Sequence, residues 1–564
     1  MVEVLANPAF VLIAGAALLP MFRGSAQRAY LLALPVAALA MLVALPEGER
    51  GQLHLLGLEL VTLRLDELSF AFGLAFLIAG AIVALYSWHV RDTPQHMASL
   101  VYAGAAMGAL LAGDLITLFV FWELTAIASA ILIWSRRNEA SYRAGVRYLI
   151  IQATSGVLLL AGAVLQLTTA GHVRFEAMAL DNAAAWLVLL AFGIKCAFPL
   201  LHNWLQDSYP EATVTGTVWL SVFTTKLAVY ALARGFAGAE ILVAIGVIMT
   251  LFPVFYAVIE NNLRRVLSYS LNNQLGFMVA GIGIGTELAV NGAVAHAFAH
   301  IIYKALLFMA MGAVLHRAGT INASELGGLY KSMPWTAAFC IIGSMSISAV
   351  PLLSGFVTKS MILVGAAEDG RWLAYGLLLV ASAGVVDHSG IKIPFFSFFA
   401  HDRGLRVTEA PVNMLLAMGA AAVLCIGIGL YPQPLYDLLP YDADYVPYTS
   451  THVVTQAQLV IFAAAAFAFL YRRGWYPPEL RSLNLDSDVV YRKAAPNVLR
   501  ATARVGYEIR DRVAAPLRRR VVAAGALAIR PIQQRGWLAA AWSTGAMVWW
   551  VALLLGLYLA FALT

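Results

Sequence analysis

Apolar runs of about 20 residues, separated by short polar segments, follow one another along most of the chain. A helix needs about 20 apolar residues to cross a hydrocarbon core of about 30 Å, so the pattern predicts about 16 spans. They lie near residues 2–22, 28–46, 69–88, 97–113, 115–134, 144–168, 184–206, 213–234, 239–260, 265–286, 290–315, 335–364, 371–400, 412–431, 453–472 and 541–562. We therefore predict an all-α polytopic membrane protein.

Composition supports this fold class. Of the 564 residues, 61% are hydrophobic and 12% are charged, and the charged share is about half that of a soluble domain. These values exclude a soluble enzyme, a disordered chain and a nucleic-acid-binding protein. The long runs also exclude an outer-membrane barrel, whose strands alternate over about 10 residues. The three cysteines lie inside apolar runs without zinc or iron–sulfur spacing, so we expect no metal and no cofactor.

The distribution of arginines predicts the orientation. Basic loops mark the cytoplasmic side, and the loops after odd-numbered spans carry most of the arginines. The residues concerned are Arg23, Arg28, Arg136, Arg137, Arg143, Arg264, Arg265, Arg403 and Arg406. The first apolar run follows no basic region and no clear cleavage site, so we read it as a span rather than a removed signal. We predict a multi-pass protein of the cell (inner) membrane with its N-terminus outside.

The C-terminal part is strongly basic. Between Tyr491 and Ala540, eleven basic and two acidic residues give a net charge of +9, against +6 for the whole chain. Arginines alternate there with apolar residues at roughly helical spacing, and Pro516 and Pro531 interrupt the pattern. The pattern indicates a basic amphipathic helix against anionic lipid headgroups, followed by a last span. A solvated linker is the alternative.

Several ionisable side chains stand inside the predicted spans, where one charge costs at least about 2.5 to 3.5 kcal/mol. They are Glu123, Lys195, Lys226, His296, His300, Lys304, Lys359 and Lys392. His296, His300 and Lys304 are four residues apart and share one helix face. A single lysine could extend to the interface, and a single histidine could be structural. Neither explanation can hold for so many ionisable groups over about six spans. We therefore interpret the set as a proton path.

The residue types fit protons better than dehydrated cations, because carboxylates are too few for a string of cation sites. A buried lysine holds its proton less firmly, and a nearby carboxylate restores its affinity. We therefore expect Glu123 to face Lys195 and to form a switch with it. Pro199, and Pro351 to Gly355, are expected to break two helices, which is typical of transporter ion sites.

The stretch Phe198–Ala212 resembles the FPLHxWLPDAxPEAP signature of the antiporter-like subunits of respiratory complex I and of Mrp-type cation/proton antiporters. Matches at Phe121–Glu123, His296–Phe308 and Ser354–Lys359 follow in the order of that family. The resemblance covers roughly residues 65–470. The stretches 214–216, 224–234, 327–331 and 391–396 look most like the D-type subunit of the Mrp antiporters. Gln206 stands where the signature has a proline.

The resemblance implies two inverted five-helix repeats with discontinuous helices, joined by a hydrophilic axis. We place N-terminal spans and a hairpin-like outer loop at 1–96, the first repeat at 97–238 and the second at 239–400. C-terminal spans would occupy 401–475, the basic lateral helix 476–540 and the final span 541–564. The axis would be the proton path of the eight residues above, with Lys392 near its exit.

The function implied is that of a proton-translocating subunit of a multisubunit monovalent cation/proton antiporter, a transporter rather than an enzyme. Its partners would be other membrane subunits, protons and Na⁺ or K⁺. One alternative is the proton-pumping membrane arm of a redox complex, such as complex I or a membrane-bound hydrogenase. The other is a non-conducting scaffold subunit, although such a chain would be expected to lose its costly buried charges.

Overall fold

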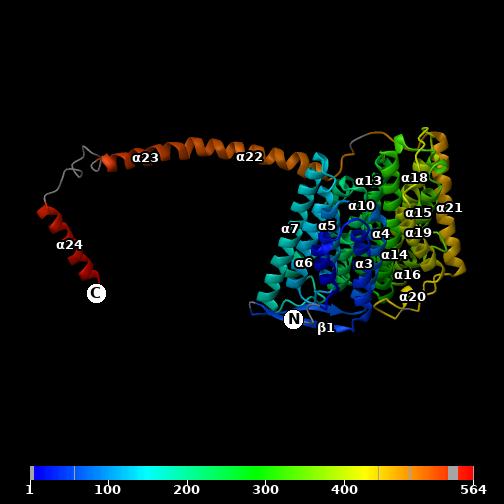
Figure 1. Ribbon diagram of the computed structural model, residues 1–564, viewed down its shortest axis with the longest axis horizontal. Coiled ribbons are helices and arrows are strands. Elements are labelled where there is room, and N and C mark those ends of the chain that lie inside the picture. Colours follow the sequence, from blue (N-terminus) through cyan, green and yellow to red (C-terminus); the bar gives the residue numbers. More distant parts are fainter. Residues whose placement is uncertain (1–5, 56, 443, 482–483, 531–543, 563–564) are drawn as a thin grey trace. The chain divides into compact units, whose positions relative to one another are not determined.

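The computed structural model describes residues 6–55, 57–442, 444–481, 484–530 and 544–562. These residues form helices almost throughout, with one pair of strands, which confirms the predicted all-α polytopic membrane fold. The chain divides into two units, residues 1–484 and 485–564. Figure 1 shows the first unit as a bundle of roughly parallel helices with a β-hairpin at one end.

The N-terminal part of the chain contains this hairpin between helices. Its elements are α2 (Pro8–Leu18), η1 (Leu19–Met21), α3 (Gly24–Ala44), β1 (Gly48–Leu55), β2 (Leu58–Leu65), α4 (Glu67–Tyr86) and η2 (Ser87–His89). The two strands pair antiparallel, with Gly48 opposite Leu65. Asp66 begins α4 with a capping box, in which its side chain and that of Ser69 each accept a hydrogen bond from the other's backbone amide. The hairpin thus leads directly into a capped helix.

The first set of path residues stands on the helices that follow. These are α5 (Thr93–Leu110), α6 (Leu115–Trp134), α7 (Glu139–Ala170), α8 (Ala183–Lys195), α9 (Asn203–Ser208), η3 (Tyr209–Glu211), α10 (Val214–Val222) and α11 (Thr224–Phe236). Asp114 caps α6 and Asn138 caps α7 through their side-chain oxygens. Glu123 lies near the middle of α6, and Lys195 is the last residue of α8.

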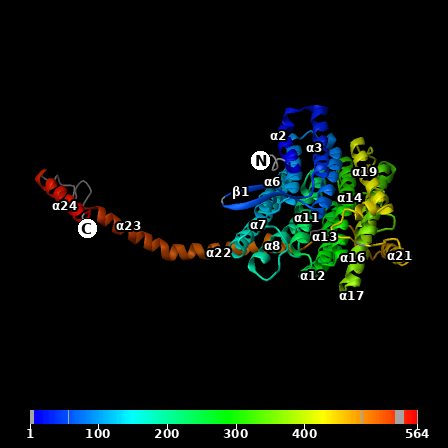
Figure 2. The same ribbon diagram turned by 90° about the horizontal axis from the view of Figure 1, so that it is seen from below.

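The other path residues, from His296 to Lys392, stand on the elements that come next. These are α12 (Ile241–Ile259), α13 (Leu263–Ile284), α14 (Glu287–Ala318), η4 (Ala323–Glu325), η5 (Leu329–Lys331), α15 (Pro334–Ile347) and α16 (Ser354–Glu368). One long helical stretch comes next, with α17 (Trp372–Val385), the π-helix η6 (Val386–Ile391), α18 (Lys392–Pro394) and the π-helix η7 (Phe395–Phe399). The first unit ends with α19 (Val412–Leu430), α20 (Gln433–Tyr436) and α21 (Ser450–Arg473). Figure 2 shows α2 and α3 at one edge of this unit and α17 at the opposite edge.

Every predicted span coincides with helical structure. Eleven helices of the described chain are long and apolar enough to cross a membrane. The other five predicted spans coincide with the short α2–η1 segment, the more polar α5 and α13, and the two interrupted pairs α8–α9 and α15–α16. The membrane-spanning character is therefore confirmed, and the number of about 16 crossings stays a prediction.

The two predicted helix breaks are present and share one backbone geometry. Ala197-Phe198-Pro199-Leu200 and Ala349-Val350-Pro351-Leu352 each have a positive φ at the alanine and at the leucine. The amides of Phe198 and Val350 each bond the carbonyl five residues back, to Gly193 and Met345 respectively. This is a Schellman helix ending with alanine where glycine is usual. The Ala-X-Pro-Leu sequence therefore marks both breaks.

Helices α12 and α13 pack closely enough for their backbones to touch. A Cβ on Gly246 would lie 2.4 Å from the amide nitrogen of Ala280, and one on Gly276 would lie 2.6 Å from the carbonyl of Gly246. Small residues permit this approach between membrane helices. The packing fixes α13, whose buried polar residues are Ser268, Ser270, Asn272, Asn273 and Gln274. Asn272 donates to the carbonyl of Ala197 at the first break, and Ser270 and Gln274 contact Lys304 and His296.

One residue used in the orientation argument has another role. Arg264, the second residue of α13, is 2% exposed and donates to the carbonyls of Tyr209, Ala212 and Thr213. Its guanidinium satisfies the loop between η3 and α10 rather than facing solvent. Arg264 therefore does not count as a free basic loop residue, whereas its neighbour Arg265 is partly exposed.

The second unit contains the basic helix. It runs through η8 (Val490–Ala494), α22 (Ala495–Ile509), η9 (Arg510–Ala514) and α23 (Ala515–Ile529), followed by α24 (Thr544–Ala562). The expected interruption at Pro516 was wrong. A π-helical turn stands before the α-helical turn that holds Pro516, and likewise before Pro496. Wider turns accommodate a proline, which has no amide to donate. Pro531 lies outside the described residues.

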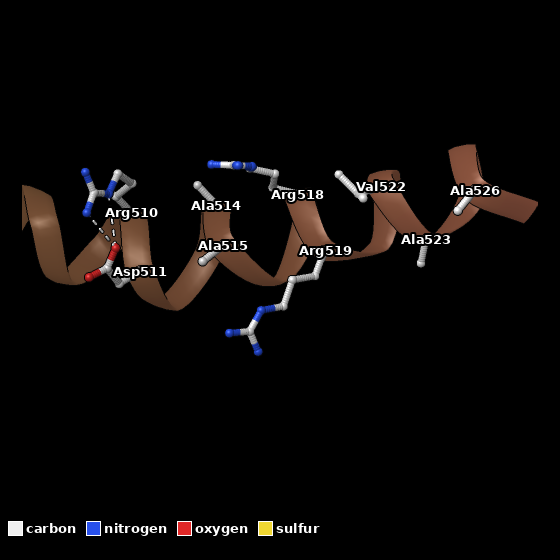
Figure 3. Close-up of a pocket in the computed structure, with 9 residues that line it drawn as sticks. All are labelled: Arg510, Asp511, Ala514, Ala515, Arg518, Arg519, Val522, Ala523 and Ala526. Atoms are coloured by element: carbon white, nitrogen blue, oxygen red, sulfur yellow. Dashed lines mark hydrogen bonds and ion pairs between the residues drawn. The ribbon is translucent and has the colours of Figure 1, made fainter.

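The arginines of this unit project from the helix in different directions. Figure 3 shows Arg518 and Arg519 pointing to opposite sides, while Arg510 pairs with Asp511 beside them. No residue described in α22 or α23 is buried. The apolar residues between the arginines, such as Val522, are therefore as exposed as the charges.

Candidate functional site

Lys195 and Glu123 come close without pairing. The Lys195 ammonium donates to the carbonyl of Trp122 and to Oγ1 of Thr125, each at 2.7 Å, and lies 4.2 Å from the Trp122 ring centre. Oε1 of Glu123 is buried with no hydrogen-bond partner in the described chain. The expected contact between them is therefore not formed in this structure, because Lys195 bonds to another face of α6. Glu123 is still the carboxylate whose charge acts on Lys195.

Lys226 lies at a third interruption, between α10 and α11. Its ammonium donates to the carbonyl of Ser221 at 2.5 Å. At the same interruption, the hydroxyl of Tyr102 accepts from the backbone amide of Thr224 at 3.0 Å and bonds its Oγ1 at 2.5 Å. A break in a buried helix frees backbone groups that need partners. Here Lys226 and Tyr102 supply them, so the lysine is held where the helix is interrupted.

Helix α14 carries three path residues on one fully buried stripe, as predicted. His296, His300 and Lys304 are each 0% exposed. Nδ1 of His296 lies 3.0 Å from Oγ1 of Thr358, and Nε2 lies 3.0 Å from Oε1 of Gln274. The Thr358 hydroxyl itself donates to the Ser354 carbonyl at 3.0 Å. Both ring nitrogens therefore face oxygens that can accept a hydrogen bond, an arrangement that satisfies a ring with N–H groups on both nitrogens.

His300 and Lys304 continue this stripe. Neither ring nitrogen of His300 has a hydrogen-bond partner within the described residues, and the charges of Lys226 and Lys304 both act on it. The Lys304 ammonium donates to Oγ of Ser270 at 2.8 Å. Buried polar groups without partners are exceptional and call for a functional explanation. A histidine on which the charges of two lysines act is suited to exchange protons at ordinary pH.

Lys359 on α16 and Lys392 on α18 are also buried. The Lys359 ammonium donates to the carbonyl of Ile347 at 3.0 Å and lies 4.9 Å from the centre of the Phe277 ring. Ile347 is the last residue of α15, so this lysine also binds at a helix break. The Lys392 ammonium donates to the carbonyls of Val258 and Glu260 at the end of α12. Lys226, Lys359 and Lys392 thus each bind carbonyls that helix ends leave free.

Amide side chains satisfy both proline breaks. Asn272 of α13 donates to the carbonyl of Ala197 at 2.9 Å, and Gln456 of α21 donates to the carbonyl of Ser348 at 3.0 Å. Gln456 and Phe467 are the buried residues of α21 in the described chain. The broken helices are therefore held open by dedicated hydrogen bonds rather than by water alone.

Sequence reasoning missed the polar partners of the path. Ser270, Gln274 and Thr358 contact Lys304 or His296 directly, and Asp387-His388-Ser389 lies in a buried π-helical turn. A signal was available, because the stretch from Ser268 to Gln274 is mostly polar inside a predicted span.

Among the described residues, no group of three metal-ligating side chains is assembled, and the three cysteines are buried and free.

Near Lys392 the path reaches carboxylates, one of which, that of Glu479, lies outside the spans. The carboxylates of Glu479, Asp387 and Glu260 act on the Lys392 ammonium. Glu479 lies in the segment after α21, and burial raises the pKa of its carboxyl. The Lys392 end of the path is therefore the end at which carboxylates gather.

Comparison with known proteins identifies a family that matches about half of the chain. The family described as "NADH:quinone oxidoreductase/Mrp antiporter, TM" matches residues 112–384. That range contains seven of the eight predicted path residues, and Lys392 follows it.

The similar proteins belong to multisubunit membrane systems. The D subunit of the Na(+)/H(+) antiporter of Alkalihalophilus pseudofirmus is 31% identical over 372 residues, which are 60% of this chain and 73% of that protein. Hydrogenase-4 component B of Escherichia coli is 26% identical over 457 residues, 72% of this chain and 67% of that protein. A chain in the Mrp complex from Dietzia sp. DQ12-45-1b superposes with a TM-score of 0.75 at 25% identity, over 93% of this chain and 63% of that one. The chain belongs to the NADH:quinone oxidoreductase/Mrp antiporter transmembrane family.

Proposed function

We propose that this protein is the proton-translocating subunit of a multisubunit monovalent cation/proton antiporter, equivalent to the D-type subunit of the Mrp systems. The similarity to the D subunit of the Na(+)/H(+) antiporter supports the coarse function, a membrane component of an antiporter or of a complex I-like arm. The single observation that carries the proposal is the buried line of titratable groups. Lys195, Lys226, His296, His300 and Lys304 are each 0% exposed, and Lys359 and Lys392 are each 1% exposed.

The line supports proton transfer because several of its members act on one another electrostatically. Lys226 and Lys359 act electrostatically on Lys304, and Lys226 acts on His300. Glu123 and Lys195 act on each other at one end. A proton placed on one group therefore weakens proton binding at its neighbours. Such coupling favours movement of charge along the line instead of storage at one position.

Cation exchange would take place in the assembled complex, with other membrane subunits as partners. The chain itself offers lysines and histidines, which cannot bind Na⁺ or K⁺ while they hold protons. We assign to this chain the proton movement, with the basic side of the protein, including the loop of Arg136 and Arg137, facing the cytoplasm. In this orientation, the N-terminus lies outside.

A second candidate is the proton-pumping arm of a redox complex. It is favoured by the similarity to Hydrogenase-4 component B over 72% of this chain. Both candidates use the same buried line and differ in what drives it. A scaffold subunit without conduction is less well supported, because the costly buried lysines and histidines are all retained.

The test is transport by the intact complex. The complex would be isolated through a tag on this chain and reconstituted in vesicles that contain a pH-sensitive dye. We expect an imposed Na⁺ or K⁺ gradient to drive proton flux without any electron donor. Flux that appears only with an electron donor and quinone would favour the redox candidate, and no flux under either condition would contradict both.

A further inference from the structure

Lys304 and Lys392 are both buried, and their own hydrogen bonds do not connect them. The ammonium of Lys304 bonds Ser270, whereas that of Lys392 bonds two backbone carbonyls. A carbonyl oxygen holds an ammonium in place but does not take up its proton at ordinary pH. A proton that leaves Lys304 for Lys392 therefore needs other groups between them that can both accept and donate a proton.

A hydrogen-bonded chain leads from Lys304 to His388. Lys304 donates to Ser270 at 2.8 Å, Ser389 donates to Ser270 at 2.7 Å, and Nδ1 of His388 lies 2.8 Å from Oγ of Ser389. His388 and Ser389 are each 0% exposed, as are Ser270 and Lys304. The chain crosses from α14 through α13 to the π-helix η6.

The other side of the His388 ring is directed to no partner within the described chain. Its Nε2 is buried and makes no hydrogen bond. Lys392 stands four residues further along the same helical stretch, and its charge, with those of Lys304 and Lys359, acts on His388. The ring thus has one nitrogen on the chain from Lys304 and one free nitrogen, with Lys392 about one turn away.

The π-helical turn brings this segment against the second helix break. A Cβ on Gly390 would lie 2.3 Å from Oγ of Ser348, beside the left-handed Ala349. π-turns inside helices are rare and often occur at functional sites. Here the turn places the backbone of η6 next to the break that holds Lys359.

We propose that His388 is a proton-carrying residue that links Lys304 to Lys392 through the hydroxyls of Ser270 and Ser389. The inference rests on the proposed function and adds a residue to its path. The Lys304 N–H bond breaks as an O–H bond forms on Ser270. Ser270 passes its own proton to Ser389, and Ser389 passes its proton to Nδ1 of His388. The imidazolium then releases the Nε2 proton to the neutral amine of Lys392, so atoms and charge balance and both serines are unchanged.

The arrangement found is not yet aligned for this transfer, because Lys304 and Ser389 both donate to Ser270. Ser389 donates to Ser270, so Nδ1 of His388 must carry the hydrogen that points at Ser389. Rotation of the two hydroxyls and a change of the ring to the Nε2–H tautomer would align the chain. A serine hydroxyl rotates readily.

The decisive variant is His388→Asn. An asparagine amide can keep the hydrogen bond to Ser389 but cannot take up a proton. We expect proton flux per assembled complex to fall by about ten-fold or more. Ser389→Ala should give a similar loss, and Ser389→Thr, which keeps the hydroxyl, should restore most of the flux. Ser382→Ala is the matched control, because Ser382 is equally buried on α17 and its hydroxyl bonds no described residue.

The outcomes separate this inference from the proposed function. Lys195→Ala is measured in parallel. Loss of flux in Lys195→Ala with wild-type flux in His388→Asn and Ser389→Ala would overturn the role of His388 and leave the proposed path standing. Wild-type flux in all of these variants would overturn both. If His388→Asn fails to assemble, the Ser389→Ala and Ser389→Thr pair decides, since equal flux in the two would contradict the relay.

Discussion

A Cβ on Gly156 of α7 would lie 1.7 Å from Oε1 of Glu123 on α6. The missing side chain at Gly156 therefore creates the space that the Glu123 carboxylate occupies. Lys195 meanwhile bonds the carbonyl of Trp122 and the hydroxyl of Thr125. The carboxylate and the ammonium are thus held in separate places in this structure.

Gly156→Ala tests this relationship. The added methyl group would occupy the position of Oε1 and force Glu123 out of its place. Because Glu123 is the carboxylate that acts on Lys195, we expect flux per assembled complex to fall about ten-fold. Flux would be measured in vesicles that contain the whole complex.

Gly427→Ala on α19 is the control, since a Cβ there meets nothing within 4 Å. It should leave flux unchanged. Wild-type flux in Gly156→Ala, with normal assembly, would show that the position of Glu123 does not matter to transport.

The sequence predicted the helices well because their apolar runs are long and Asp66, Asp114 and Asn138 cap them locally. It also predicted both proline breaks, since Pro199 and Pro351 end a helix by local chemistry alone. These features depend on residues that are neighbours in the chain, which is why pattern reasoning finds them.

The partners of the path could not be predicted in the same way. The contact between His296 and Thr358 joins residues 62 apart, and that between Lys304 and Ser270 joins residues 34 apart. Such contacts depend on how α13, α14 and α16 pack. The expected Glu123–Lys195 pair was likewise a tertiary contact, and the space beside Gly156 gives the carboxylate another position. The interruption expected at Pro516 was wrong because a π-helical turn before this proline lets the helix continue.

Asn272 stabilises the first helix break, which predicts an effect on stability. Asn272→Leu removes the donor to the buried carbonyl of Ala197. Leaving a buried acceptor without a partner costs about 1 to 3 kcal/mol. We therefore expect a lower unfolding temperature of the detergent-solubilised complex. Ala197→Gly should act in the opposite direction, because alanine has a φ of 63° at this position and glycine adopts such a conformation without strain. An unchanged melting temperature in Asn272→Leu would contradict the role of this bond.

The second unit is expected to anchor the protein and not to conduct. Truncation before Asp486 removes α22, α23 and α24 and leaves all eight path residues in place. Each basic residue near an anionic surface contributes about 1 kcal/mol of binding, so we expect less assembled complex on a native gel. Flux per assembled complex should stay nearly unchanged. Normal assembly with lost flux would show that this unit couples to the path.

An ion pair joins the segment after α21 to the loop that contains η4, and it predicts a pH dependence. Hydrogen bonds from Thr320, Asn322 and Arg481 lower the pKa of Glu325 from 4.5 to about 2. A carboxylate with a lowered pKa stabilises the folded state fully above its ordinary pKa, and this contribution disappears as the pH falls from 4.5 towards 2. The contact should therefore be constant between about pH 6 and 8.

Limited proteolysis of residues 474–484 measures this contact. Glu325→Gln should increase cleavage equally at about pH 6 and pH 8, because the variant lacks the charge at both. Arg472→Gln, at an exposed site in the last turn of α21, should not. Cleavage of the unmodified protein that changes between these two pH values would be inconsistent with a low pKa at Glu325.

Proton flux in Lys195→Ala tests the proton path most directly. Lys195 is 0% exposed and is the one ammonium that bonds the helix of Glu123 in the described chain. Lys331→Ala is the control, since Lys331 is an exposed lysine paired with Asp402. The complex would be reconstituted in vesicles and driven by a cation gradient, with assembly checked on a native gel. We predict that Lys195→Ala assembles and loses cation-driven proton flux, while Lys331→Ala keeps it. Wild-type flux in assembled Lys195→Ala would contradict a proton path through the buried Glu/Lys/His line.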